Sequence, residues 1–162
     1  MMKETFYPLG KSFALITKAY IGAISSRLSH LDIERHFYLL YRIGTATEPL
    51  TQKDLGEIIN QDKSAMVRII DYLSDYGYVR RKQNAEDRRE YFIVLTPKGE
   101  QVIPEIKAAF SFVDDAALQS LNSEDRACLD KVLQSVYENL NRLPAQDVKL
   151  DYKKSSLSSS NS

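Results

Sequence analysis

The chain has 162 residues, 43% of them hydrophobic and 27% charged, so it can bury a core and is not a disordered protein. Its 22 Lys and Arg residues balance its 22 Asp and Glu residues, so composition indicates no nucleic-acid or membrane partner and any basic surface has to be local. The single cysteine, Cys128, excludes an intramolecular disulfide and a cysteine-rich metal site. Without a signal peptide or an apolar run of about 18 residues, a cytoplasmic protein that avoids membranes is expected.

Two helices are predicted before residue 45. A short arm, residues 1–7, leads to Pro8, which suits a first helical turn. Apolar residues then recur with helical spacing at Leu9, Phe13, Ile16, Tyr20, Ile24 and Leu28. Asp32 is the expected N-cap of a second helix, Ile33 to Ile43, and Gly44 is expected to end it.

A helix-turn-helix is predicted from Thr51 to Tyr76. Thr51 is the expected cap of its first helix, with Asp54 favourably placed in the first turn. The expected buried face of that helix is Leu55, Ile58 and Ile59. Asp62 is the expected cap of the second helix, which Gly77 should end. Its core positions are predicted at Met66, Ile69, Ile70 and Leu73.

The apolar period then changes to that of strands. Tyr78 to Lys82 and Tyr91 to Leu95 are predicted as a hairpin, which after a helix-turn-helix is a wing. Five basic residues make this hairpin locally positive: Arg80, Arg81, Lys82, Arg88 and Arg89. Asp87 is expected to hold one arginine of the loop and to leave another for a partner.

Two long helices are predicted to follow the hairpin. Thr96-Pro97 should start a helix over residues 97–121, and Asn122 with Ser123 should cap a last helix that Pro144 ends. A winged helix needs only residues 31–96, so the amphipathic helices at 8–29 and 97–143 must pack on each other or on a second chain.

The predicted fold class is mainly α with a small β-hairpin wing: a winged helix-turn-helix flanked by N- and C-terminal dimerisation helices. The expected units are an N-terminal dimerisation helix (1–30), the winged helix-turn-helix (31–96), C-terminal dimerisation helices (97–145) and a serine-rich flexible tail (146–162).

The second helix of the helix-turn-helix is a candidate for reading DNA bases, because a recognition helix uses the residues at its N-terminal end. An arginine side chain can hydrogen-bond guanine, and a serine hydroxyl can hydrogen-bond several bases. Alanine or valine can contact a thymine methyl group. Arginine at a hairpin tip fits a narrow minor groove. The candidate DNA-binding residues are Thr51, Gln52, Lys63, Ser64, Ala65, Val67, Arg68, Lys82, Arg88 and Arg89. The alternative is an ordinary solvated helix face, since Asp71 and Asp75 share it and repel phosphate.

Five segments together resemble the MarR family of bacterial dimeric winged-helix regulators. They are Leu50-Thr51-Gln52-Lys53-Asp54-Leu55, residues 62–73, Gly77-Tyr78-Val79-Arg80-Arg81, Asp87-Arg88-Arg89 and Leu95-Thr96-Pro97-Lys98-Gly99. The resemblance covers about residues 8–143, and the Asp-Arg-Arg wing followed by Leu-Thr-x-x-Gly is its most specific part.

The resemblance implies a homodimer, formed through the terminal helices, that binds pseudo-palindromic double-stranded DNA. Many such proteins release DNA when a small aromatic molecule binds between the dimerisation helices and the winged helix. Mapped onto this chain, the candidate ligand-binding residues are Tyr20, His36, Phe37, Tyr41 and Val102. The alternative is that these side chains belong to the core.

Other sensing chemistry is not expected. The peroxide-sensing branch carries its reactive cysteine in the N-terminal helix, whereas Cys128 lies beside Leu129 in an amphipathic helix, which favours a buried, inert thiol. His30 and His36 point to different faces of any single helix, so no metal is expected, and no cofactor either.

The sequence therefore predicts a DNA-binding transcriptional regulator, usually a repressor in this family. An enzyme is not expected, because the chain has no glycine-rich phosphate loop, nucleophile elbow or metal-ligand set. The alternative is a winged helix used for protein interaction without DNA binding.

Overall fold

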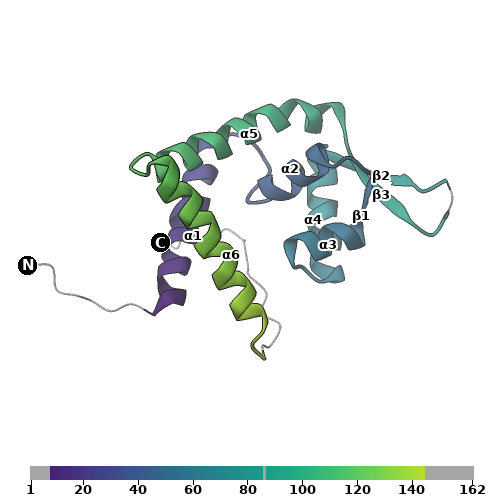
Figure 1. Ribbon diagram of the computed structural model, residues 1–162. Coiled ribbons are helices and arrows are strands. Elements are labelled where there is room, and N and C mark those ends of the chain that lie inside the picture. Colours follow the sequence, from purple (N-terminus) through teal and green to yellow (C-terminus); the bar gives the residue numbers. More distant parts are fainter. Residues whose placement is uncertain (1–7, 86, 145–162) are drawn as a thin grey trace, which may run out of the picture.

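The computed structural model describes residues 8–85 and 87–144 (Figure 1). The elements are α1 (Leu9–Arg27), α2 (Phe37–Thr45), β1 (Leu50–Thr51), α3 (Gln52–Ile59), α4 (Lys63–Asp75), β2 (Val79–Gln83), β3 (Tyr91–Leu95), α5 (Pro97–Leu118) and α6 (Ser123–Asn141). The prediction of a mainly helical winged helix-turn-helix fold is confirmed, and the dimerising role of its flanking helices stays a prediction. The expected N-terminal arm and serine-rich tail lie outside the described residues.

A small antiparallel sheet joins the helix-turn-helix to the wing. Its strand order is β1-β3-β2, with Leu50 opposite Ile93 and Arg81 on the other side of the same residue. The sequence did not indicate β1, because two residues are too few to show an alternating pattern. The hairpin of β2 and β3 projects from one end of the molecule (Figure 1).

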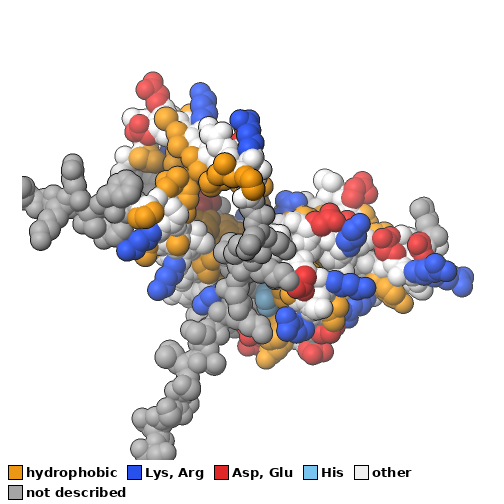
Figure 2. Space-filling view, turned by 90° about the horizontal axis from the view of Figure 1, so that it is seen from below, with side chains coloured by type: hydrophobic (Ala, Val, Ile, Leu, Met, Phe, Trp, Pro, Cys, Tyr) orange, Lys and Arg blue, Asp and Glu red, His pale blue; other side chains and the backbone are white. Residues whose placement is uncertain are grey.

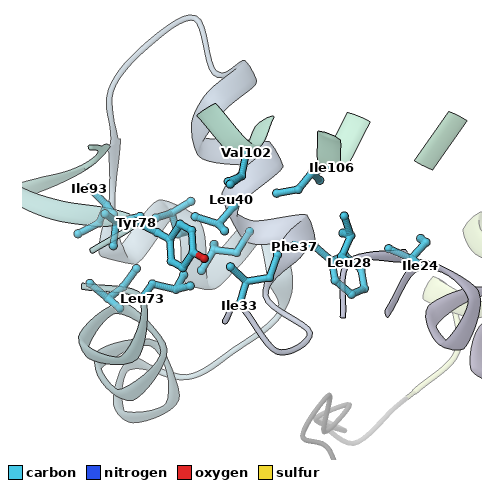
Figure 3. Packing of buried hydrophobic residues seen from close by; sticks show 14 of the residues in the cluster. Ile24, Leu28, Ile33, Phe37, Leu40, Leu73, Tyr78, Ile93, Val102 and Ile106 are labelled. Carbon is cyan, nitrogen blue, oxygen red and sulfur yellow. The ribbon is translucent and has the colours of Figure 1, made fainter. Parts of the chain in front are cut away.

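One hydrophobic core holds the winged helix to the helices on either side of it. Figure 3 shows Leu40, Leu73 and Ile93 pointing toward one another from α2, α4 and β3. The same cluster continues through Ile106 of α5 to Ile24 of α1, and both side chains are fully buried. α5 therefore connects the winged helix to the terminal helices through continuous packing.

The second helix begins later than predicted. Residues 31–36 form turns, α2 starts at Phe37, and Asp32 does not cap it. The cause is the backbone of Glu34, whose φ of 47° lies in the left-handed region and interrupts a helical run. The helix also continues through Gly44 to Thr45, so Gly44 does not end it.

The other predicted helix starts are confirmed. The Thr51 side chain accepts a hydrogen bond from the Asp54 backbone N–H and Asp54 reciprocates, which makes a capping box. Thr96 caps α5 and Asn122 caps α6 in the same manner, each by accepting from a backbone N–H three residues on.

The predicted core faces of α3 and α4 are partly wrong. Leu55 is buried as expected, but Ile58 and Ile59 are only half-buried, as is Ile69 of α4. These three isoleucines line a cavity described below. Gly56 is buried in their place, because Gln61 and Met66 approach its backbone too closely for a larger residue.

The last helix has no buried residue in the protomer. The predicted burial of Cys128 is therefore wrong: its thiol is exposed, since no described residue of α6 is buried against the rest of the described chain. Figure 2 shows hydrophobic side chains gathered on the lobe that carries α1 and α6. Across the described residues, no helix has the length and apolar character that crossing a membrane requires.

Candidate nucleic-acid interface

Both ends of α4 are fixed by hydrogen bonds. At its start, Asp62 Oδ1 accepts from the Ala65 backbone N–H at 2.7 Å, which confirms the predicted cap. At its end, Gly77 adopts a φ of 75°, and its N–H donates to the Ser74 carbonyl. The Tyr78 N–H donates to the Leu73 carbonyl, which completes a Schellman motif. This motif turns the chain directly into β2.

The N-terminal half of α4 presents an exposed face. Lys63, Ser64, Val67 and Arg68 are exposed and Ala65 is half-buried, while Met66 and Ile70 are buried on the opposite side. The side chains proposed to read bases therefore face away from the core.

Arg68 also belongs to a second surface. Together with Ala65, Ile69 and Tyr72 it lines the cavity, and these positions form one stripe of α4 at helical spacing. Arg68 thus lies at the edge between the outward face and the cavity. Lys63, Ser64 and Val67 lie outside that lining.

The predicted contacts at the start of α3 differ from one another. Thr51 is buried, and its hydroxyl hydrogen-bonds Asp54 Oδ2 at 2.7 Å, so it is occupied by the capping box. The hydrogen bond from the Thr51 backbone N–H, and then that from its hydroxyl, lower the pKa of Asp54. Gln52 is half-buried at the surface beside them.

The tip of the wing is held by its own hydrogen bonds. Gln83 Nε2 donates to the Arg88 carbonyl at 2.8 Å, and Asn84 Nδ2 donates to the Glu90 carboxylate at 2.9 Å. The expectation that Asp87 pairs with an arginine side chain is corrected: its carboxylate accepts from the Arg89 backbone N–H at 2.9 Å. This hydrogen bond shapes the loop without engaging a guanidinium.

Four basic side chains of the hairpin remain directed to solvent. They are Arg80, Lys82, Arg88 and Arg89, and all are exposed. Figure 2 shows Lys and Arg side chains at the far end of this hairpin, with Asp and Glu nearer to the body of the molecule. The wing is therefore a local basic feature in a chain without net charge.

The fifth basic residue of the hairpin, Arg81, has a partner that the sequence did not predict. Arg81 Nη2 lies 2.8 Å from Asp71 Oδ1, which joins β2 to α4. Asp71 was expected to repel phosphate, but its charge is paired. Alternation along β2 could have indicated that Arg81 points away from its neighbours Arg80 and Lys82, toward the helix.

The base of the wing explains the Leu-Thr-x-x-Gly motif. Thr96 Oγ1 donates to the Gly77 carbonyl at 2.6 Å, and the Thr96 backbone N–H donates to the Tyr78 carbonyl at 3.0 Å. Gly99 lies against that same carbonyl, where a Cβ atom would approach its oxygen within 3.0 Å. The motif thus packs the first turn of α5 onto the end of α4.

A cavity of about 800 Å³ lies beside α4, between the winged helix and the terminal helices. Of the candidate ligand-binding residues, the structure brings Tyr20, His36 and Phe37 to its lining. It places Tyr41 and Val102 outside that lining: Val102 is buried in the core, and Tyr41 packs edge-on against Phe110 at 5.4 Å. The lining also includes Phe110, Arg68 and Tyr72, which the sequence did not indicate.

The cavity wall carries both aromatic and polar groups. The Tyr20 hydroxyl donates to Asp114 Oδ1 at 2.7 Å; burial, with this hydrogen bond and the Asp114 charge, raises the pKa of Tyr20. Burial, then the charge of Glu34, raises the pKa of Tyr72 to about 12. Both phenols are therefore protonated at neutral pH. The His36 ring meets the Tyr72 ring edge-on at 5.7 Å.

The histidines do not gather into a metal centre. His30 Nε2 contacts Glu105 Oε1 at 2.7 Å, and His36 lies at the cavity. Within residues 8–85 and 87–144, no three His, Cys, Asp or Glu side chains are grouped so that they could hold a metal ion.

Comparisons with known proteins agree with this architecture. Residues 32–90 match the model of the MarR family. A solved structure described as the transcriptional regulator PA3341 is 29% identical with a TM-score of 0.74, over 84% of this chain and 100% of that one. A MarR transcriptional regulator from Methanosarcina mazei Go1 is 26% identical with a TM-score of 0.73, over 83% of this chain and 96% of that one.

The structure of S. aureus MepR in complex with DNA has the same fold. It superposes with a TM-score of 0.77 at 17% identity, over 83% of this chain and 99% of that one. This chain is therefore similar to the MarR family in the sequence of its winged helix, and it shares the fold of these transcriptional regulators over most of its length.

Proposed function

We propose that this protein is a homodimeric transcriptional repressor that binds an inverted-repeat DNA operator and releases it when a small aromatic acid binds. The observation that carries the proposal is the joint exposure of the N-terminal half of α4 and of the basic wing. One element suits the major groove, and the other suits the minor groove and the phosphates.

The reading element is α4. Its exposed N-terminal residues Lys63, Ser64 and Val67 belong to the part of a recognition helix that reaches base edges. Arg68 follows one residue later and can reach a guanine from the edge of the same face. DNA binding by a similar fold in S. aureus MepR supports this assignment.

The second element is the wing. Lys82, Arg88 and Arg89 are exposed on a hairpin that projects from the body of the protein. Phosphate contacts by such residues supply affinity that depends on salt and little on sequence. The wing therefore contributes affinity and α4 contributes sequence preference.

Dimerisation is supported by the apolar surface of the terminal helices. Ile16 of α1 is 64% exposed, and Tyr137 of α6 is also 64% exposed. Further exposed apolar residues of α6 are Val132, Leu133, Leu140 and, just beyond its end, Leu143. Apolar surface of this extent on two helices favours a second copy of the chain as its cover, and a two-fold dimer would present two copies of α4 to one operator.

Ligand release is supported by the cavity. Its aromatic wall suits a ring, and Arg68 suits a carboxylate. A ligand there contacts α4 on the flank of its reading face, so it can have different affinities for the free and the DNA-bound protein.

Selection of DNA fragments by the purified protein tests the proposal. Recovered sites should be inverted repeats with half-sites about one helical turn apart, roughly 34–36 Å. A parallel salt titration on random duplex should show binding that falls steeply with salt. Absence of both kinds of binding would support a protein-interaction module instead. Addition of benzoate to the operator complex tests release.

A further inference from the structure

We infer that Arg81 is a positioning residue, which fixes the wing on α4 through Asp71 and so sets the geometry between the two DNA-contacting elements. This inference rests on the proposed DNA-binding function. The observation that supports it is the ion pair between Arg81 Nη2 and Asp71 Oδ1, which lie 2.8 Å apart and connect β2 with α4.

The position of Asp71 makes this ion pair relevant to the interface. Asp71 follows Ser64, Val67 and Arg68 at spacings of seven, four and three residues, so it lies on the same side of α4. An unpaired carboxylate there would face the phosphates of a bound duplex. Pairing with Arg81 removes that repulsion and occupies the one basic residue of β2 that points to the helix.

The wing needs such a connection. A two-stranded hairpin is weakly ordered by itself. β1 supports β3 only at Leu50 and Thr51, at the base of the wing. β2 is the outer strand of the sheet, and Arg81 lies at its middle residue, opposite Ile93. The ion pair thus fixes the outer strand to α4 at the level where β1 supports β3, which is the base from which the wing projects.

The ion pair contributes little to global stability. The two side chains are 36% and 51% exposed, and such pairs are screened by solvent and salt. Variants at these positions should therefore fold. A change in DNA binding, or in the local opening of the hairpin, then reports on the contact between the wing and α4.

The experiment compares Arg81→Gln with the charge swap Asp71→Arg/Arg81→Asp, and uses Arg80→Gln as the matched control. In the protein without DNA, Arg81→Gln should speed amide hydrogen exchange in the hairpin by about two- to fivefold, and the charge swap should restore protection. Arg80→Gln should leave exchange unchanged, because Arg80 is exposed on the other side of the strand. Unchanged exchange in Arg81→Gln would overturn the inference even if the protein bound no DNA.

Operator binding provides the second readout. Arg81→Gln should weaken binding by roughly three- to tenfold with the salt slope unchanged, because the Asp71 charge is uncovered while the number of neutralised phosphates stays the same. The charge swap should recover affinity. If the slope flattens by about one unit and the swap recovers nothing, Arg81 binds phosphate directly and the inference is wrong. Failure of the wild-type protein to bind any duplex would contradict the proposed function instead.

Discussion

Replacement of Gly99 by alanine tests how α5 is docked onto the end of α4. A Cβ atom at this position would lie within 3.0 Å of the Tyr78 carbonyl oxygen and would also crowd Leu95. The obstacle is backbone, and that carbonyl already accepts a hydrogen bond from the Thr96 N–H, so it cannot move without weakening that bond. Overpacking costs about 1–3 kcal/mol, and alanine regains up to about 1 kcal/mol of helix propensity. The expected net loss of stability is about 1–2 kcal/mol.

Thermal unfolding at one fixed protein concentration measures this loss. For a chain of this length the melting temperature should fall by roughly 2–8 °C. Gly10→Ala is the control, since nothing lies within 4 Å of the Cβ position in that exposed part of α1. It should leave the melting temperature unchanged or slightly raised. An equal melting temperature for wild type and Gly99→Ala would refute the close approach as the reason for glycine.

Two further predictions concern association and acid stability. Tyr137→Glu places a charge on the exposed apolar face of α6, so it should shift light scattering from dimer to monomer, whereas Lys131→Glu on the same exposed helix should not. The lowered pKa of Asp54 means that its contribution to stability is complete above its ordinary pKa of about 4 and is lost as the pH falls through the folded value. Asp54→Asn should therefore make the free energy of unfolding, measured by urea denaturation, depend less on pH on the acid side. If that dependence is unchanged, the capping box does not contribute to the loss of stability in acid.

Local signals account for the parts of the fold that the sequence predicted. Caps at Thr51, Asp62, Thr96 and Asn122 act within one helical turn, so the residue types alone indicate where each helix begins. The start of α2 could not be predicted, because the left-handed backbone at Glu34 depends on the packing of its neighbours and carries no residue signal. The prediction that Cys128 is buried failed for a related reason. Amphipathic spacing identifies the apolar face of a helix, but it does not show whether residues of the same chain cover that face.

The candidate site was predicted unevenly. Periodicity placed Lys63, Ser64 and Val67 on an exposed face, because that depends on one helix only. Cavity residues come from several elements, so spacing could not separate Tyr20, which lines the cavity, from Tyr41, which packs against Phe110. The Arg81–Asp71 pair joins residues of two elements, and a single sequence gives no signal that pairs them.

The proposed division of labour between α4 and the wing can be separated with Arg68 and Arg88. Arg68 lies in the first two turns of α4, within reach of base edges, whereas Arg88 lies in the loop of the hairpin. Arg68→Ala should cost about 1–3 kcal/mol on the best operator and relax preference at one base pair in each half-site. Arg88→Ala should weaken binding to many sequences and flatten the salt slope by about one unit for each phosphate that the wing no longer neutralises.

Both variants should keep the fold, because both side chains are exposed and neither fills the core. The measurement is a salt titration of each variant on the operator and on a scrambled duplex. Equal weakening of both duplexes by Arg68→Ala would mean that α4 does not read sequence through this residue. Unchanged affinities and slopes in Arg88→Ala would mean that the wing does not touch the DNA. Since Arg68 also lines the cavity, Arg68→Ala should in addition reduce the release caused by benzoate, an effect that Arg88→Ala should not share.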